Sequence, residues 1–489
     1  MKQNLLLLLF TAGVAAGCAK ASIPQDASDI ARIERVENGL LPRAVIKGED
    51  SSMKLADRMA FFKVPGVSIA VINDGKLAWA RGYGVLDAGS PQAVTPETLF
   101  QAASISKPVS AMAALALVEQ GKLSLDENVN LKLTSWQLPD NKFTKTEKVT
   151  LRRVLSHSAG LTVHGFPGYA ANESVPALTQ ILDGQKPLTN TGPIRVDRLP
   201  GKELRYSGGG YTVMQQLMID VTGKPFPNLL QELVLNRIGM RHSTFVQPLP
   251  KELEGAAATG HRPDGVAIKG HWHTYPEMAA AGLWTTPSDL ALFATDLIEA
   301  ARGKPNGVLS PEMSRQMLTK QMGSYGLGLS LGGESVTSFS HGGSNEGFTC
   351  ILVANVKTGQ GAIVMTNSDN GPPLFNEILR AISHEYNWTD YRPKEPNLAQ
   401  IDPATLASYV GQYDANGTPV TVSLQSGKLS IQTPPMGPSP FQLYPSAEDR
   451  FFLVEADDFE VRFVKDSQAK VSELQIQAGT DRATAARVK

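Results

Sequence analysis

From about Ile30 onward, the hydrophobic and polar positions form a mixture of strand-like and helical patterns. The run VPGVSIAVINDGKLAWARGYG (64–84) contains two strand-like segments on either side of Asn-Asp-Gly (73–75), which predicts a β-hairpin. An Ala/Leu-rich stretch that opens at Ser104 predicts a long helix, because Pro108 needs no backbone donor in a first helical turn.

Further helices and a group of strands are predicted downstream. The stretch GYTVMQQLMIDVTGK (210–224) has helical periodicity and stops at Gly223, and Thr286 to Asp289 caps a helix from Leu290 to Arg302. Strand patterns then dominate, in YGLGLSL (325–331), VTSFSHGG (336–343), CILVANV (350–356) and GAIVMTN (361–367). The segment PPLFNEILRAISHEY (372–386) predicts a closing helix.

A change of composition marks a second domain near the C-terminus. Around RPKEPNLAQIDP (392–403) the chain becomes linker-like, and the tail carries short β-like runs separated by turn residues. A chain of 489 residues is too long for one ordinary domain. We therefore expect a leader, a main domain, a linker and a small β domain, at residues 1–21, 22–390, 391–402 and 403–489.

The composition is that of a globular protein, with 42% hydrophobic and 19% charged residues. The formal net charge is −1 and no basic run is present, so nothing in the sequence favours nucleic acid or an anionic membrane surface as a partner. We expect a small-molecule or peptide substrate. The sequence leaves the oligomeric state open.

The N-terminus predicts export. A short positive start is followed by an apolar run (5–10) and by small residues up to Cys18. The stretch from Ala15 to Cys18 resembles a bacterial lipoprotein box, which would attach the protein to a membrane through a lipidated Cys18, whereas Ala19-Lys-Ala suits an ordinary signal peptidase. Both routes lead to the bacterial periplasm or cell envelope. Cys350 is then the single cysteine of the mature domain and has no disulfide partner within the chain.

The start of the predicted Ala/Leu-rich helix carries Ser104-Ile-Ser-Lys107. One helical turn separates Ser104 from Lys107, so both side chains lie on one face. A lysine of lowered pKa can help to accept the proton of a serine nucleophile, and free N–H groups at a helix start favour developing negative charge. The tetrapeptide alone is weak evidence, because Ser51-x-x-Lys54 and Ser467-x-x-Lys470 share it.

Two later segments could complete an acyl-transfer site. In ELRYSGGGYTVMQQL (203–217), Tyr206 precedes a Gly-rich turn, and a nearby lysine charge would lower the pKa of its hydroxyl and make it a general base. In SFSHGGSNEGF (338–348), His341 ends a strand pattern and enters a glycine loop where a substrate backbone can approach closely. Structural readings of both segments, a packed tyrosine ring and a Gly-rich hairpin turn, stay open.

Taken in this order, the three segments resemble the serine β-lactamase and penicillin-binding-protein superfamily, and most closely the class C β-lactamases with their related D-Ala-D-Ala carboxypeptidases, D-aminopeptidases and esterases. That family carries Ser-x-x-Lys, then Tyr-x-Asn, then Lys-Thr-Gly or His-x-Gly. Supporting stretches such as LRRVLSHSAGL and AAGLWTTPSDLALF extend the resemblance from about Ala31 to Tyr386. The tail also resembles small β-barrel modules appended to some of these proteins.

The resemblance implies an α/β plus all-α two-lobed β-lactamase/transpeptidase-like fold with a small C-terminal β-barrel-like domain. Ser104 would be acylated, Lys107 and Tyr206 would shuttle its proton, and the N–H groups of Ser104 and Ser344 would bind the oxyanion. The substrate-binding and oxyanion residues that it implies are His341, Gly343 and Ser344. It implies no cofactor.

Two departures from the family pattern affect the expected substrate. Gly208 stands where the family commonly has an asparagine, and His341 stands where many members have a lysine. A neutral histidine attracts a substrate carboxylate less strongly than lysine does. Both changes argue against an efficient β-lactamase and favour an esterase, amidase or peptidase. A D-amino-acid peptide, a β-lactam and a small ester all remain candidate substrates.

Two other hypotheses compete with the hydrolase. One is a non-catalytic cell-envelope binding protein on the same fold, which the intact Ser104, Lys107 and Tyr206 disfavour. The other is a metal site at His261, His271 and His273, and we expect none because the sequence offers no nearby carboxylate or cysteine set.

Overall fold

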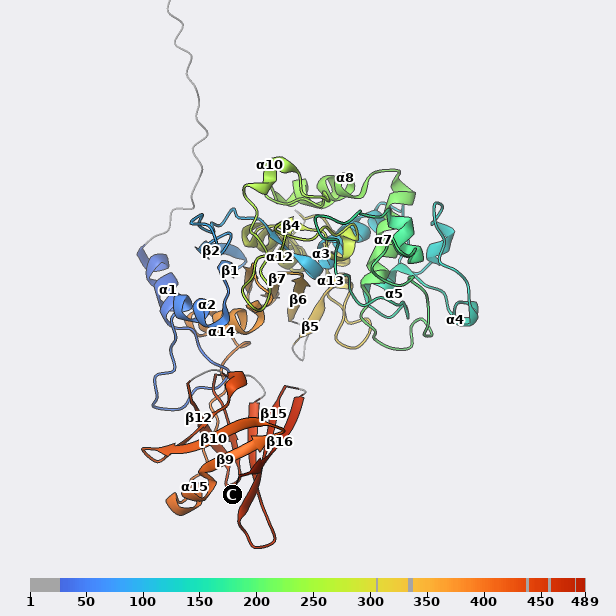
Figure 1. Cartoon of the computed structure of the whole chain (residues 1–489). Coiled ribbons are helices and arrows are strands. Elements are labelled where there is room, and N and C mark those ends of the chain that lie inside the picture. The colour runs from blue at the N-terminus through green and yellow to red at the C-terminus, as the bar shows by residue number, and fades with distance from the viewer. Residues whose placement is uncertain are drawn as a thin grey trace, which may run out of the picture.

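The computed structural model describes residues 27–304, 307–332, 337–436, 439–455, 459–479 and 481–488. The predicted leader, with Cys18, lies outside these residues. An α/β body and a helical region stand side by side, and a β-barrel lies below the body (Figure 1). Across the described ranges, no helix combines the length and the hydropathy that a bilayer span requires.

The body is built on a six-stranded antiparallel sheet in the order β2-β1-β8-β7-β6-β5. Its strands are β1 (Gly66–Asn73), β2 (Lys76–Gly84), β5 (Ser330–Gly332), β6 (Ser338–Asn345), β7 (Phe348–Asn355) and β8 (Gln360–Thr366). Asp74 and Gly75 join β1 to β2 with positive φ angles of 53° and 69°, as a tight hairpin turn requires. The predicted hairpin is therefore confirmed.

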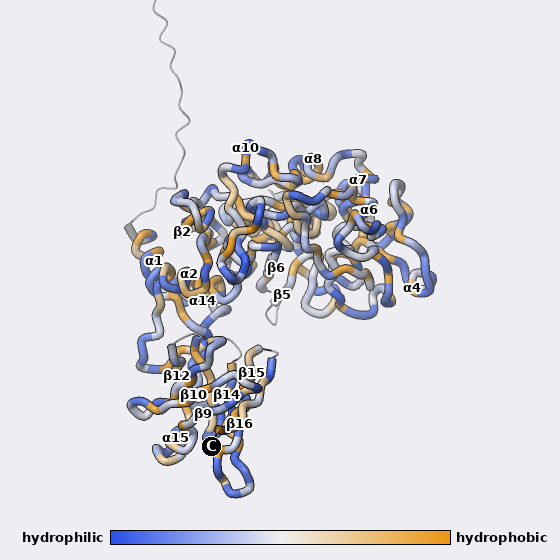
Figure 2. Tube along the Cα trace, viewed as in Figure 1, coloured by the Kyte–Doolittle hydropathy of each residue, from blue (hydrophilic) through white to orange (hydrophobic). Residues whose placement is uncertain are grey.

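Helices cover both faces of the sheet, because successive strand residues point to opposite sides. Val67, Ile69 and Val71 pack into the core that contains α14, and Ala70 and Ile72 pack into the core that contains α12. The covering helices are α1 (Ala27–Asn38), α2 (Leu55–Phe62) and α14 (Gly371–Glu385) on one face and α12 (Pro287–Ala301) on the other. Figure 2 shows the hydrophobic segments along α14 and the hydrophilic loops around α4.

The helical region surrounds α3 (Ser106–Glu119), which is almost entirely buried. Its other α-helices are α4 (Lys142–Thr146), α5 (Leu151–Leu155), α6 (Leu178–Asp183), α7 (Gly208–Thr222), α8 (Phe226–Leu230), α9 (Asn236–Ile238), α10 (Lys251–Glu254), α11 (Met278–Ala281) and α13 (Pro311–Met317). The short elements are η1 (Ala103–Ile105), η2 (Val129–Leu131), the π-turn η3 (Gln231–Leu235), β3 (Phe100–Gln101) and β4 (Trp284–Thr285). One continuous hydrophobic core joins this region to the inner face of the sheet.

The C-terminal domain is a closed barrel of eight antiparallel strands. The strands are β9 (Gly411–Ala415), β10 (Thr418–Gln425), β11 (Lys428–Gln432), β12 (Phe441–Ala447), β13 (Arg450–Phe452), β14 (Phe459–Lys465), β15 (Val471–Ala478) and β16 (Asp481–Arg487), with η4 (Pro434–Met436) between β11 and β12. Tyr409, from the preceding helix α15 (Pro403–Tyr409), stacks on Phe463 at 4.1 Å between ring centroids. Side chains fill this interior, so the barrel is a packed core.

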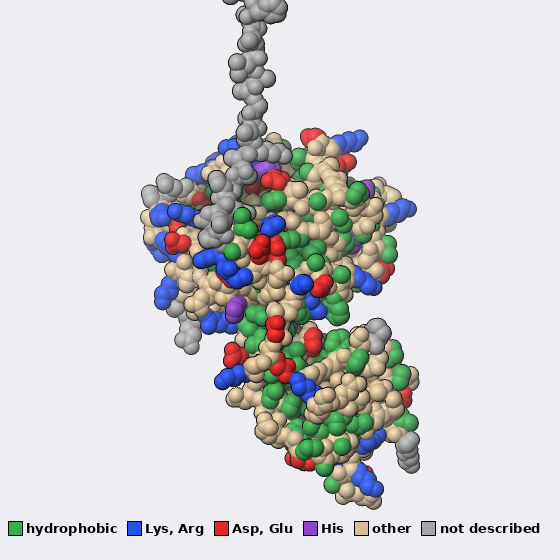
Figure 3. Space-filling view, turned by 90° about the vertical axis from the view of Figure 1, so that its left-hand side faces the viewer, with side chains coloured by type: hydrophobic (Ala, Val, Ile, Leu, Met, Phe, Trp, Pro, Cys, Tyr) green, Lys and Arg blue, Asp and Glu red, His purple; other side chains and the backbone are tan. Residues whose placement is uncertain are grey.

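The barrel contacts the body through a loop near the N-terminus. The carboxylate of Glu49 accepts hydrogen bonds from Lys428 Nζ at 2.7 Å and from the hydroxyl of Tyr444 at 3.1 Å. Ala44 and Ile46 pack beside this pair against the barrel. Acidic and basic side chains are interspersed over the face of both parts seen in Figure 3.

Most predicted elements are present, and two differ in ways that matter for the site. The segment 325–331 forms a strand only from Ser330; Tyr325 makes isolated bridges, and residues 327–329 form a bend. The strand β6 continues through Asn345, beyond the strand pattern predicted for 336–343, so the glycine segment expected to enter a loop is part of the strand. The candidate residues His341, Gly343 and Ser344 therefore lie on a sheet strand, with the rigidity that the ladder to β7 gives them.

Candidate active site

Ser104 and Lys107 are brought together at the start of the buried helix. Ser104 lies in the 3₁₀ turn η1, and α3 begins two residues later. The amine Nζ of Lys107 lies 3.0 Å from Ser104 Oγ and donates a second hydrogen bond to the carbonyl oxygen of Ala280 at 2.8 Å. The spacing of the motif therefore gives a nucleophile and base pair in hydrogen-bond contact.

Burial enables Lys107 to act as a base. Its side chain is almost fully enclosed, with 2% of the residue exposed, and none of the described carboxylates is paired with it. Because the charged form loses its hydration there, burial lowers the pKa of Lys107 to about 7. A substantial fraction of the amine is then neutral near neutral pH and free to accept the proton of Ser104.

Ser106, the other serine of the motif, has a structural role. Ser106 Oγ donates to the carbonyl of Ala103 at 2.5 Å and accepts the backbone N–H of Leu283 at 3.0 Å. These two bonds tie η1 to the segment before β4. The Ser106 hydroxyl therefore has a structural role, and Ser104 is the serine in contact with Lys107.

A close approach between η1 and β6 explains why Gly343 is a glycine. A Cβ atom at Gly343 would lie 2.4 Å from the carbonyl oxygen of Ala102 and 2.5 Å from Cys350 Sγ. Any side chain there would push the strand away from the serine. Ala103 directly precedes Ser104 in the chain and lies beside Gly343 in space. Its φ is +47°, an unfavourable value for a residue with a Cβ.

Tyr206 reaches the same point from the segment before α7. Its ring centroid lies 5.0 Å from Lys107 Nζ, and its hydroxyl faces the Ser104 side chain closely enough for that serine to lower the phenol pKa. Burial is the larger effect and raises the pKa of Tyr206 to about 12. The expectation that Lys107 lowers this pKa is wrong, because desolvation of the phenolate dominates. The neutral phenol can still relay a proton between Ser104 and Lys107.

His157 is a further residue of this site and comes from the stretch LRRVLSHSAGL. Its ring lies against that of Tyr206, with centroids 4.2 Å apart and a tilt of 30°. Its Nδ1 accepts the backbone N–H of Ser207 at 3.1 Å, and burial lowers its pKa well below the ordinary value, so the ring is neutral. The signal was present in LSHSAGL, but nothing in the sequence shows that this turn packs against Tyr206.

His341 lies on β6 and is also neutral. Burial, reinforced by nearby Lys107, lowers its pKa to about 3. Nδ1 lies 2.6 Å from the carbonyl oxygen of Gly342, which can only accept, so Nδ1 carries the proton. The buried Nε2 has no partner among the described residues and is an acceptor.

The strand edge beside His341 is open in the part of the chain that the structure describes. β5 pairs with β6 only at positions 338–340, and the stretch from His341 to Asn345 has β7 on its other side alone. The stretch carries Ser344, and β6 packs directly on η1. The backbone N–H groups that point away from β7 are thus available for an oxyanion or an extended substrate.

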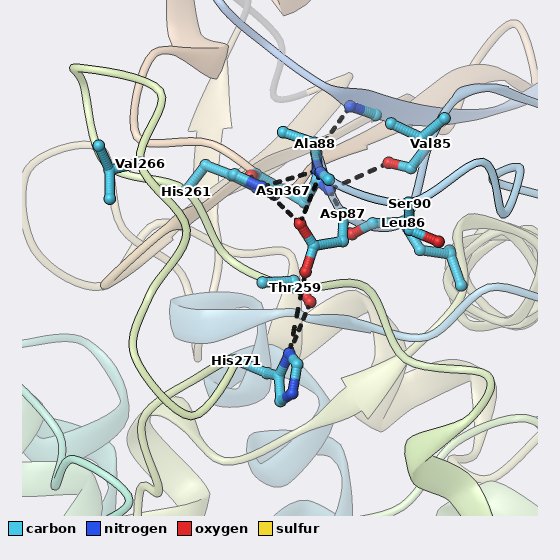
Figure 4. A network of polar contacts seen from close by, with 12 residues as sticks. Val85, Leu86, Asp87, Ala88, Ser90, Thr259, His261, Val266, His271 and Asn367 are labelled. Carbon is cyan, nitrogen blue, oxygen red and sulfur yellow. Dashed lines mark hydrogen bonds and ion pairs between the residues drawn. The ribbon is translucent and has the colours of Figure 1, made fainter.

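His261 and His271 belong to a separate polar network around Asp87 (Figure 4). Nε2 of His261 and Nδ1 of His271 lie 3.7 and 4.0 Å from the carboxylate of Asp87. His261 also accepts a backbone N–H and contacts a carbonyl oxygen, and His273 contacts a different carbonyl. No three metal-ligating side chains converge within the described ranges, and this network fastens loops together.

Comparison with known proteins identifies the family to which the chain belongs. The family model described as Beta-lactamase matches residues 54–386. The chain belongs to the beta-lactamase family. A curated relative, Protein flp of Staphylococcus aureus (strain MW2), is 23% identical over 382 residues, which cover 73% of this chain and 68% of that protein. Penicillin-binding protein 4 of Amycolatopsis lactamdurans is 24% identical over 376 residues, covering 72% of this chain and 94% of that protein.

Solved structures agree on the fold. The octameric penicillin-binding protein homologue from Pyrococcus abyssi matches with a TM-score of 0.61 and 22% identity, over 88% of this chain and 98% of that one. The crystal structure of SurE with D-Leu matches with a TM-score of 0.54 and 20% identity, over 89% and 97%. The resemblance inferred from the motifs and the predicted fold, including the C-terminal barrel, are therefore confirmed. Family membership supports a serine hydrolase type of function.

Proposed function

We propose that this protein of the beta-lactamase family is an exported serine hydrolase that cleaves an ester or amide through an acyl-Ser104 intermediate, with small uncharged esters as preferred substrates. The proposal is carried by the contact of 3.0 Å between Ser104 Oγ and the buried amine of Lys107. D-amino-acid peptides and β-lactams are the competing substrates.

Acylation begins with the transfer of the Ser104 proton to neutral Lys107, directly or through the phenol of Tyr206. The oxygen Oγ attacks the carbonyl carbon of the substrate, and the carbonyl oxygen becomes an oxyanion. The backbone N–H groups of Ser104 and Ser344 stabilise this charge. The carbon–oxygen or carbon–nitrogen bond to the leaving group then breaks, and Lys107 returns the proton to the leaving group through Tyr206.

Deacylation reverses the roles. Water attacks the acyl carbon and gives a proton to Lys107 through Tyr206, the bond between the acyl carbon and Oγ breaks, and Ser104 recovers a proton. The carboxylic acid product leaves. Over one turnover Lys107 accepts two protons, from Ser104 and from water, and gives up two, to the leaving group and to Ser104. A single group with a pKa near neutrality can therefore serve both steps.

The substrate preference follows from charge. Substrates that end in a carboxylate need a cation or a strong donor near β6, where many family members have a lysine. His341 is neutral here and its free nitrogen is an acceptor, so it repels a carboxylate oxygen. An ester without a carboxylate meets no such penalty.

Export is part of the proposal and is supported by the leader sequence alone. The segment up to Cys18 has the order of a bacterial signal, with a choice between lipid attachment and free secretion. We place the protein in the periplasm or cell envelope, where envelope peptides and esters are available.

The test is intact-protein mass spectrometry after incubation with an alkyl fluorophosphonate and, separately, with a fluorescent penicillin. We expect the fluorophosphonate to add one phosphonyl group per chain to wild type and none to Ser104→Ala. A matched control is Ser467→Ala, which removes the serine of another Ser-x-x-Lys from an exposed turn of the barrel.

The outcomes separate the hypotheses. Labelling by the fluorophosphonate alone supports an esterase or amidase, a persistent penicillin adduct supports a peptidase, and rapid penicillin turnover supports a β-lactamase. If folded wild type reacts with neither probe, the hydrolase proposal is wrong and a non-catalytic envelope binding protein replaces it.

A further inference from the structure

We propose that Phe166 and the loop around it form an apolar wall for the acyl group of the substrate, so that the site selects simple apolar acyl groups over acyl groups that carry an amide. This inference rests on the proposed function and specifies its substrate. The relevant loop is the connection between α5 and α6, at residues 161–168.

The loop is fastened to the start of α7. The N–H of Gly208 donates to the carbonyl of His164 at 2.9 Å, and the N–H of Gly209 donates to the carbonyl of Val163 at 3.0 Å. Ser207 Oγ adds a bond to the carbonyl of Thr162 at 2.8 Å. The first N–H groups of a helix are normally free, and here the loop satisfies them, which fixes its distance from the site.

Gly208 is the residue that permits this approach. A Cβ atom at Gly208 would lie 3.0 Å from the carbonyl oxygen of His164 and 3.1 Å from Cε2 of Phe166. The space that an asparagine side chain would take is therefore occupied by the half-buried Phe166 ring and by the loop backbone. The glycine at the position of the family's asparagine therefore allows the loop to lie this close to the start of α7.

The same loop borders the catalytic tyrosine. The exposed ring of His164 lies 4.9 Å from the ring of Tyr206, with a tilt of 43°. Tyr325 faces Tyr206 from another side, with centroids 6.3 Å apart. Aromatic rings thus surround Tyr206, and the partly buried Phe166 of the same loop packs against the main hydrophobic core.

The chemistry of this wall determines the acyl group that it accepts. A phenyl ring provides apolar contact and neither donates to nor accepts from an amide group. An amide placed against it would lose its hydration without a replacement hydrogen bond. A simple alkyl acyl group loses only unfavourable contact with water.

The experiment compares two esters that share one leaving group, p-nitrophenyl hexanoate and p-nitrophenyl N-acetylglycinate, with rates in Ser104→Ala subtracted. We expect wild type to prefer the hexanoate, and Phe166→Ala to lower the ratio of the two kcat/KM values by about tenfold. Phe166→Leu, which keeps apolar volume, should lower the ratio less and serves if the alanine variant fails to fold.

Two more variants sharpen the result. Gly208→Asn alone should reduce turnover of both esters, because its side chain meets the loop, whereas Gly208→Asn with Phe166→Ala should move the ratio furthest toward the N-acetylglycinate. Phe61→Ala, at a ring that is 55% exposed on α2, should leave the ratio unchanged.

An unchanged ratio in folded Phe166→Ala and Phe166→Leu, with Ser104-dependent turnover intact, would overturn the acyl-wall inference and leave the proposed hydrolase standing. Absence of Ser104-dependent turnover or labelling in wild type would overturn both.

Discussion

The imidazole of His157 lies against the ring of Tyr206 at 4.2 Å, and its Nδ1 accepts the N–H of Ser207. The first contact fixes the plane of the tyrosine ring, and the second fixes the backbone one residue later. His157 therefore positions the phenol that contacts Ser104, although it does not reach Ser104 itself.

We predict that His157→Leu lowers kcat for an ester by about 10²-fold with little change in KM, because Tyr206 loses its orientation in the reacting complex. His157→Asn, whose amide oxygen can accept the same N–H, should retain more activity. The check is steady-state kinetics on variants that melt like wild type. If both variants lose stability and have the same kcat, His157 does not position Tyr206.

The activity should depend on the protonation of Lys107. Because its pKa is about 7 and the neutral amine is the base, kcat/KM for an uncharged ester should rise with pH through about 7 and then level off. Tyr206, with a pKa of about 12, should add no second ionisation below about pH 10. A profile that is flat from about pH 5 to 9 would show that Lys107 is not the titrating base.

Replacing His341 should change the charge preference of the site. His341→Lys is predicted to raise the rate of acylation by a carboxylate-bearing penicillin about tenfold, because a charged donor replaces a neutral acceptor. His341→Gln, neutral and able to donate, is the matched control. The measurement is the rate of adduct formation by mass spectrometry, and equal rates for the two variants would remove charge as the cause.

Glu277 should make the folded state less stable as pH rises. It is fully buried, neither carboxyl oxygen has a hydrogen-bond partner among the described residues, and burial raises its pKa from 4.5 to about 8. The folded protein then holds a proton that the unfolded chain has released, so its stabilising contribution is complete below about pH 4.5 and is lost as pH rises to about 8.

We therefore predict that Glu277→Gln increases the free energy of unfolding at about pH 8 by roughly 1–4 kcal/mol relative to its effect at about pH 4. Denaturant melts at the two pH values provide the measurement. Glu252→Gln, at an exposed position of α10, is the control for the same substitution outside the core. An equal effect of Glu277→Gln at both pH values would mean that Glu277 is not held as a neutral acid.

The sequence by itself determined the elements and the family motifs. The Asn-Asp-Gly turn, the periodic helix ending at Gly223 and the Thr286 cap are local signals, and each element formed where its signal lies. The spacing of Ser104 and Lys107 also fixed their contact, because one helical turn brings such side chains together in any helix.

Only the tertiary structure decided the chemical state of these residues. The pKa of Lys107 depends on burial by residues distant in sequence, and the acceptor nitrogen of His341 depends on where its other nitrogen donates its proton. The packing of Phe166 on Gly208 is likewise a contact between separate segments. Desolvation and long-range packing arise when such segments meet, so no local pattern encodes them.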